Sequence, residues 1–126
     1  MIEDSDNMNV KELVDYLGLK KLTQNIDETR PLSGCYICDL LSYVMSHASK
    51  GNVWITVQTN INVVAVASLT EVGCVIVPEN IDVEEVTIKK AEAEGIIMLS
   101  SSMTAYDIAK KLSQVLYRGI EYEMLL

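Results

Sequence analysis

The sequence predicts an α/β fold in which a mixed, mainly parallel sheet is flanked by helices. Three short apolar runs rich in β-branched residues, 53–57, 74–77 and 96–99, are typical of strands buried on both faces. The segments between consecutive runs are long enough for the helical crossovers that parallel neighbours require. At 126 residues, the chain has the length of one such domain.

The predicted domain begins with a short helix over residues 10–17. Asn9 is a favourable N-cap, and Glu12 stands three positions later, where its side chain can reach back to the cap backbone. Apolar residues recur at helical spacing through this segment, and Gly18 follows as a stop signal.

The following segment is predicted to hold two short edge strands and a second helix. Residues 19–23 and 31–36 are the edge strands, and the polar stretch 24–30 is a loop between them. Apolar residues then repeat on one helical face over 37–47. Asp39 would lie in the first turn of that helix, where the helix dipole favours a carboxylate.

Three more helices complete the predicted pattern. Residues 83–94 and 104–116 have helical periodicity, and Gly95 follows the first of them as a cap. Residues 62–72 contain VVAVA, which is compatible with a strand, but we predict a helix because the segment links two parallel strands. The C-terminal half then reads as a right-handed β-α-β-α-β-α unit.

Charge and composition narrow the possible partners. Lys and Arg total 10 against 18 Asp and Glu, a net charge of −8 that argues against a nucleic-acid-binding face. The most apolar stretch, 63–69, is far shorter than the ~20 residues that cross a bilayer, and the acidic N-terminus is unlike a secretory signal. Three cysteines form an odd, sparse set that fits a reducing compartment. We therefore expect a cytoplasmic protein with neither nucleic acid nor membrane as a partner.

The two ends of the chain are expected to differ from the rest. Residues 1–7 have no periodicity and are predicted to be a mobile tail, which leaves residues 8–126 as a single domain. Residues 117–126 are amphipathic, so they either add an element to the domain or pack on a partner.

The order of elements resembles that of the DRTGG domain family. The resemblance is carried by residues 53–116, from VWITVQTN through AYDIAKKL, and by the segments NVKELVDYLGLKKLT and GCYICDLLSYVMSHA, which look like small stand-alone members. The family's Asp-Arg and Thr-Gly-Gly signature is replaced here by Gln-Thr-Asn at 58–60 and Pro-Glu-Asn at 78–80. The resemblance implies a fold similar to the N-terminal domain of HPr kinase/phosphorylase, with a regulatory or oligomerising role.

Polar side chains follow the predicted parallel strands and mark a candidate ligand site. Ligands of parallel α/β sheets gather outside the carboxyl ends of the strands, where this chain places Thr59, Asn60, Ser100, Ser101 and Ser102. A phosphate or nucleotide could lie between them, near the N-terminus of the last helix. The alternative is that these residues only cap helices.

Cys35 and Cys38 form a Cys-x-x-Cys pair that has two possible interpretations. It could be a redox pair, with Cys38 activated at a helix N-terminus, or both could be small buried residues. A zinc site would need two further ligands, and Cys74 and His47 are the remaining candidates. We expect neither a bound metal nor another cofactor.

Three functions remain open from the sequence, and none of them is enzymatic. A nucleophile, a base and an orienting group within reach of each other are not apparent, and the P-loop motif of kinases is absent. We expect a regulatory or oligomerisation domain that forms a homodimer through residues 36–37, 40–41 and 120–126. The alternatives are a sensor of a small anionic ligand, such as a nucleotide or phosphate, and a Cys35–Cys38 redox protein.

Overall fold

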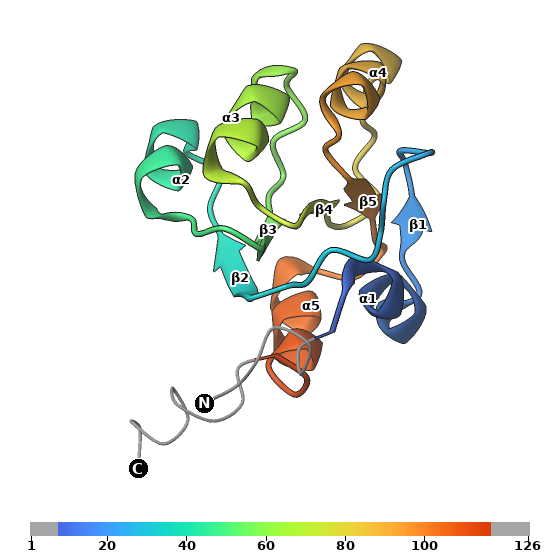
Figure 1. The fold of residues 1–126 in the computed structure, drawn as a ribbon. Coiled ribbons are helices and arrows are strands. Elements are labelled where there is room, and N and C mark those ends of the chain that lie inside the picture. The colour runs from blue at the N-terminus through green and yellow to red at the C-terminus, as the bar shows by residue number, and fades with distance from the viewer. Residues whose placement is uncertain (1–7, 117–126) are drawn as a thin grey trace.

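The computed structural model describes residues 8–116 and contains one five-stranded sheet in the order β1-β5-β4-β3-β2 (Figure 1). Strands β2 to β5 are parallel, and β1 pairs antiparallel with β5. The predicted mixed, mainly parallel sheet is therefore confirmed. The strands are β1 (Lys20–Lys21), β2 (Gly34–Ile37), β3 (Asn52–Ile55), β4 (Cys74–Val77) and β5 (Met98–Ser100).

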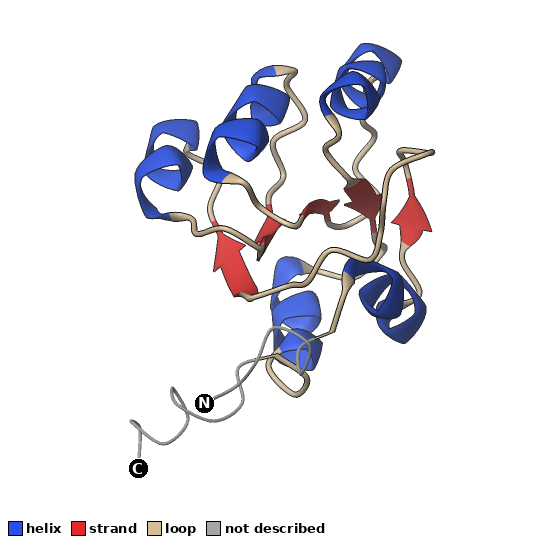
Figure 2. Cartoon of the chain, viewed as in Figure 1, coloured by secondary structure: helices blue, strands red, loops and turns tan. Residues whose placement is uncertain are grey.

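Helices cover both faces of this sheet (Figures 1 and 2). In the views shown, α2, α3 and α4 lie above the sheet, and α1 and α5 lie below it. The helices are α1 (Val10–Leu17), α2 (Leu41–His47), α3 (Asn62–Thr70), α4 (Glu85–Glu94) and α5 (Ala105–Leu112). Among residues 8–116, no helix is long and apolar enough to span a membrane.

The central strands are buried on both faces, as their apolar runs predict. Alternate side chains of each strand enter opposite cores. Val53 and Ile55 of β3 pack with α1 and α5, whereas Trp54 between them packs with α2 and α3. All three side chains are fully buried, and each such burial stabilises the fold by about 1.5–3 kcal/mol.

The first helix has the predicted ends. The side chain of Asn9 accepts a hydrogen bond from the backbone N–H of Glu12 at 2.8 Å, and the Glu12 carboxylate accepts one from the Asn9 N–H at 2.9 Å. Gly18 ends the helix in the left-handed conformation, with φ 64°. The capping box and the glycine stop are both confirmed.

The second helix begins later than predicted, at Leu41 instead of residue 37. The Asp39 carboxylate accepts hydrogen bonds from the Thr56 hydroxyl at 2.8 Å and from the Val57 N–H at 2.9 Å. These contacts hold the chain extended beyond the end of β2, so the helix starts only after Leu40. The prediction that Asp39 lies in the first helical turn is therefore wrong.

The remaining elements are found where the sequence predicts them, with shifted ends. The ambiguous segment 62–72 is helical, as α3, and β4 has the predicted bounds. The last helix ends at Leu112, and Thr104 is its N-cap. The predicted tail 1–7 and the segment 117–126 lie outside the described residues.

Candidate functional site

The carboxyl ends of β4 and β5 are joined by hydrogen bonds between their following turns. Glu79 and Asn80 both have left-handed backbones, and their N–H groups donate to the carbonyls of Met103 and Ser101, each at 2.9 Å. The Ser101 N–H donates to the carbonyl of Val77 at 3.1 Å. The Ser101 hydroxyl is buried and accepts a bond from the Met103 N–H. Ser101 therefore fixes this turn.

The other predicted site residues lie nearby but have separate roles. The Thr59 carbonyl accepts a hydrogen bond from the Thr87 hydroxyl at 3.1 Å, and the Asn60 side chain accepts one from the Asn62 N–H at 2.8 Å. Ser100 is buried in β5, whereas Ser102 is exposed. The ligand site proposed for this edge stays a prediction that rests on the position of these residues.

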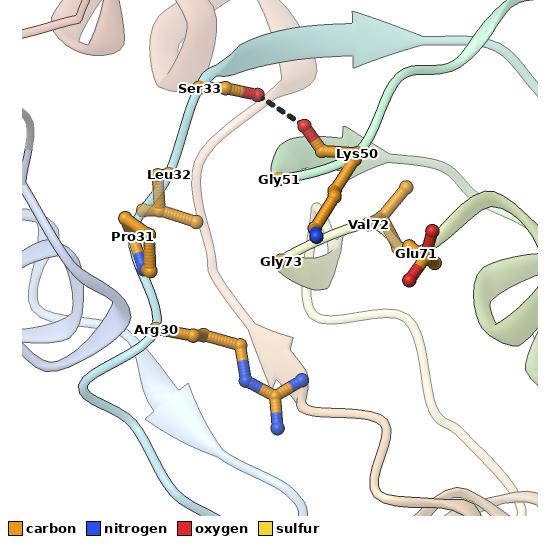
Figure 3. A pocket seen from close by; sticks show the side chains of 9 residues that line it. All are labelled: Arg30, Pro31, Leu32, Ser33, Lys50, Gly51, Glu71, Val72 and Gly73. Atoms are coloured by element: carbon orange, nitrogen blue, oxygen red, sulfur yellow. Dashed lines mark hydrogen bonds between the residues drawn. The ribbon is translucent and has the colours of Figure 1, made fainter. Parts of the chain in front are cut away.

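A cavity of about 500 Å³ lies at the opposite, amino ends of the parallel strands (Figure 3). Three loops line it: 30–33 before β2, 50–51 before β3 and 71–73 before β4. Since the strands are parallel and adjacent in the order β4-β3-β2, their preceding loops meet at one edge of the sheet. The volume is within the range of small-molecule pockets.

Backbone hydrogen bonds tie the three loops together. The N–H of Ser33 donates to the Gly51 carbonyl, and the N–H of Gly51 donates to the Glu71 carbonyl, both at 2.9 Å. The Ser33 hydroxyl also donates to the Lys50 carbonyl at 2.6 Å (Figure 3). The Gly73 N–H donates to the Asn52 carbonyl at 2.8 Å. The cavity wall is therefore built from chain segments that are distant in sequence and held in place.

Two glycines keep these loops close. A side chain on Gly73 would place its Cβ 2.5 Å from Leu32 Cδ2 and 3.1 Å from the Gly51 carbonyl oxygen. A Cβ on Gly51 would lie 2.9 Å from the Ser33 hydroxyl oxygen, and its φ of 83° also disfavours other residues. This edge was not predicted from the sequence, because the polar residues that follow the strands pointed to the carboxyl ends alone. A glycine just before each of two predicted strands was the available signal.

Three charged side chains border the cavity. Arg30 and Lys50 extend toward it from different loops, and the Glu71 carboxylate lies beside it (Figure 3). Arg30 Nη1 donates to the Gly95 carbonyl at 3.2 Å, which leaves Nε and Nη2 available as donors. Within residues 8–116, none of the three side chains is in an ion pair.

The two cysteines of the Cys-x-x-Cys pair point to different cores. Cys35 packs against the core shared with α1 and α5, whereas Cys38 packs against the core on the other face of the sheet. Burial raises the pKa of the Cys35 thiol to about 11, which disfavours the reactive thiolate. Cys38 precedes Leu40, the N-cap of α2, and so is not at the helix start. This arrangement gives no support to a redox pair.

Among the described residues, His47 contacts neighbouring residues of its own helix, α2, and no metal-binding group is formed. The ring of His47 stacks on Tyr43 with centroids 4.3 Å apart, and its Nδ1 is 2.9 Å from the Tyr43 carbonyl oxygen. In the part of the chain from 8 to 116, no three His, Cys, Asp or Glu side chains are grouped as metal ligands.

Comparisons with known proteins identify the fold. No known family profile matches the sequence, and no curated protein matches it. A solved structure does: the CBS and DRTGG domains of the regulatory region of Clostridium perfringens pyrophosphatase, complexed with the activator diadenosine tetraphosphate. It aligns with 90% of this chain at a TM-score of 0.67 and 12% identity, and this chain spans about half, 49%, of that one. The chain has a DRTGG-like fold, as its sequence resemblance predicted.

Proposed function

We propose that this protein is a non-catalytic regulatory domain that assembles as a homodimer through β2 and α2. The observation that carries the proposal is the outer edge of the sheet. In the described part of the chain, β2 pairs with β3 alone, so its other side offers unpaired backbone groups. Such an edge is a template for a further strand.

The side chains around this edge are apolar and exposed. Ile37, Leu40, Tyr43 and Met45 are each about half exposed or more, and Val44 is the single buried residue of α2. Residues 31–49 contain one Asp, Asp39, and no Glu, Lys or Arg. In a chain of net charge −8, two copies repel each other least where their surfaces are neutral. A two-fold contact there would pair identical patches.

The fold comparison supports a regulatory role. The similar structure is the regulatory region of its enzyme. The free cysteines also fit a reducing, cytoplasmic location.

The test is the mass of the full chain in solution. At micromolar concentration, light scattering should give about twice the 14.0 kDa chain mass. Leu40→Asp should give a monomer, because it places a charge in the patch. The variant should still fold, since Asp is a favourable N-cap and Leu40, the N-cap of α2, makes no side-chain cap bond.

A matched control separates the patch from general surface charge. Val86→Asp adds the same charge at a position on α4 with similar exposure, 57% against 61% for Leu40, and should leave the dimer intact. A wild-type protein that stays monomeric, or a Leu40→Asp dimer as stable as the wild type, contradicts the proposal.

A second candidate function is sensing of a small anionic ligand at the carboxyl ends of the strands, with Thr59, Asn60 and Ser100–Ser102 as contacts. The observation that favours it is the nucleotide activator bound to the similar structure. A nucleotide at 100 times its dissociation constant should raise the free energy of unfolding by about 2.7 kcal/mol. Thermal melting with adenine nucleotides measures this, and Asn60→Ala should reduce the shift. Unchanged melting with every nucleotide argues against sensing.

A further inference from the structure

We propose that the cavity at the amino ends of β2, β3 and β4 binds a phosphorylated small molecule with hydroxyl groups. Arg30 and Lys50 would hold the phosphoryl group, and Glu71 would accept hydrogen bonds from the hydroxyls. The proposal does not depend on dimerisation, and it places a ligand at the end of the sheet opposite to the Thr59–Ser100 edge.

Two cations line one cavity of an acidic protein. The chain has 10 basic residues against 18 acidic ones, yet Arg30 and Lys50 come from different loops to one cavity (Figure 3). Neither is neutralised by an ion pair within residues 8–116. A guanidinium and an ammonium are the side chains that proteins use to bind phosphate groups.

Arg30 is already held in position. Its Nη1 bond to the Gly95 carbonyl directs the guanidinium plane while leaving other N–H donors free. The loop that carries Lys50 is anchored by the bond from the Ser33 hydroxyl to the Lys50 carbonyl. A guanidinium that is already oriented loses little conformational entropy when it binds.

The shape of the cavity also supports the proposal. Gly51 and Gly73 leave backbone in its wall, and a Cβ at either position would be too close to the neighbouring loop. Pro31, which is exposed, adds apolar surface to the lining, whereas Leu32 and Val72 also line the cavity but are almost completely buried. Such a pocket accepts a ring as well as a charged group.

Glu71 narrows the class of ligand. It is the C-cap of α3, with a left-handed backbone of φ 58°, and it lines the same cavity as Lys50. A carboxylate repels a bare anion but accepts hydrogen bonds from hydroxyls. The lining therefore suits a sugar phosphate or a nucleoside monophosphate better than inorganic phosphate.

Calorimetric titration of the full chain tests the site with three probes: inorganic phosphate, ribose 5-phosphate and AMP. We expect the two organic phosphates to bind at least tenfold more tightly than inorganic phosphate. AMP binding more tightly than ribose 5-phosphate would identify the ligand as a nucleotide, whereas equal affinities would identify it as a sugar phosphate. Absence of saturable binding by all three at millimolar concentration overturns the proposal.

Variants locate the binding. Lys50→Gln should weaken ribose 5-phosphate binding tenfold or more, whereas Lys20→Gln, an equal charge change on the exposed strand β1, should change it less than twofold. Equal losses would mean non-specific attraction and overturn the site. Greater loss in Asn60→Ala than in Lys50→Gln would place the ligand at the carboxyl ends instead, and also overturns it.

Glu71→Gln tests the hydroxyl contact separately. It should weaken ribose 5-phosphate binding while strengthening inorganic phosphate binding, because it removes a negative charge beside the anion. Equal strengthening of both probes would contradict the assigned role of Glu71. A circular dichroism spectrum like that of the wild type controls for folding in each variant.

Discussion

Loops lie at both ends of the parallel strands, but the polar groups of the two sets of loops make different contacts. At the carboxyl ends, the N–H groups of Glu79 and Asn80 are bonded to the neighbouring turn, and Asp39 is bonded to Thr56 and Val57. At the amino ends, backbone bonds hold the loops around a cavity that Arg30 and Lys50 face. Ligands of such sheets usually bind at the carboxyl ends. Here Glu79, Asn80 and Asp39 use these polar groups within the fold.

The largest expected effect on stability comes from adding a side chain to a glycine at the amino ends of the strands. Gly73→Ala should lower the free energy of unfolding by about 2–3 kcal/mol, because the new Cβ collides with Leu32 and the Gly51 carbonyl. Urea denaturation measures the change. Gly18→Ala is the control: Gly18 has a positive φ but open space around it, so its cost is conformational, about 1–2 kcal/mol. Similar losses in the two variants would show that the close approach at Gly73 is unimportant.

At the carboxyl end, Asp39→Ala should destabilise the protein by about 1–2 kcal/mol, because it removes the acceptor of two hydrogen bonds. The same urea titration applies. Asp39→Asn keeps a side-chain oxygen as acceptor and should recover a large part of the loss. If Asn and Ala cost the same, the hydrogen bonds do not hold this end together.

A smaller effect is expected at the start of α5, just after the β5 end. The Thr104 side chain accepts a bond from the Asp107 N–H at 3.1 Å, so Thr104→Ala should cost about 1 kcal/mol. Thr104→Ser retains the hydroxyl and should be close to neutral. A neutral Thr104→Ala result would mean that packing alone holds the helix start.

The smallest expected effect on stability comes from ionisation of the buried thiols, and it is zero at neutral pH. Burial raises the pKa of Cys35 to about 11 and that of Cys74 to about 12. Between pH 9 and 11 the unfolded state therefore ionises its thiols while the native state does not, so stability falls as pH rises. In Cys35→Ala this slope should be shallower. An unchanged slope would mean that the native Cys35 thiol ionises normally, which would reopen the redox interpretation.

The parts of the fold that follow from local patterns were predictable. The capping box of Asn9 and Glu12 and the apolar run of β4 each depend on residues close in sequence, and both are as expected. The start of α2 was not predictable, because it depends on Asp39 reaching Thr56, 17 residues away. Local periodicity contains no information about such a contact.

The candidate site also combines features that depend on residues close in sequence with features that depend on distant residues. The sequence places hydroxyls after the strands, but it does not show that Ser101 bonds the Met103 N–H. The cavity requires residues 30–33, 50–51 and 71–73 to meet. That meeting follows from strand order, and the strand order was not predicted. Arg30 and Lys50 therefore had no visible connection in the sequence.

The single tryptophan of the chain provides a way to observe these events optically. Trp54 is fully buried, and its indole N–H donates to the Cys38 carbonyl at 2.9 Å. Trp54 lies on β3, next to the edge strand β2, and packs in the same core as Val44 of α2. Its emission spectrum should be blue-shifted in the native state and move to the red on unfolding. The intrinsic fluorescence of Trp54 therefore indicates, without an attached dye, whether the segment that follows β2 still packs on β3.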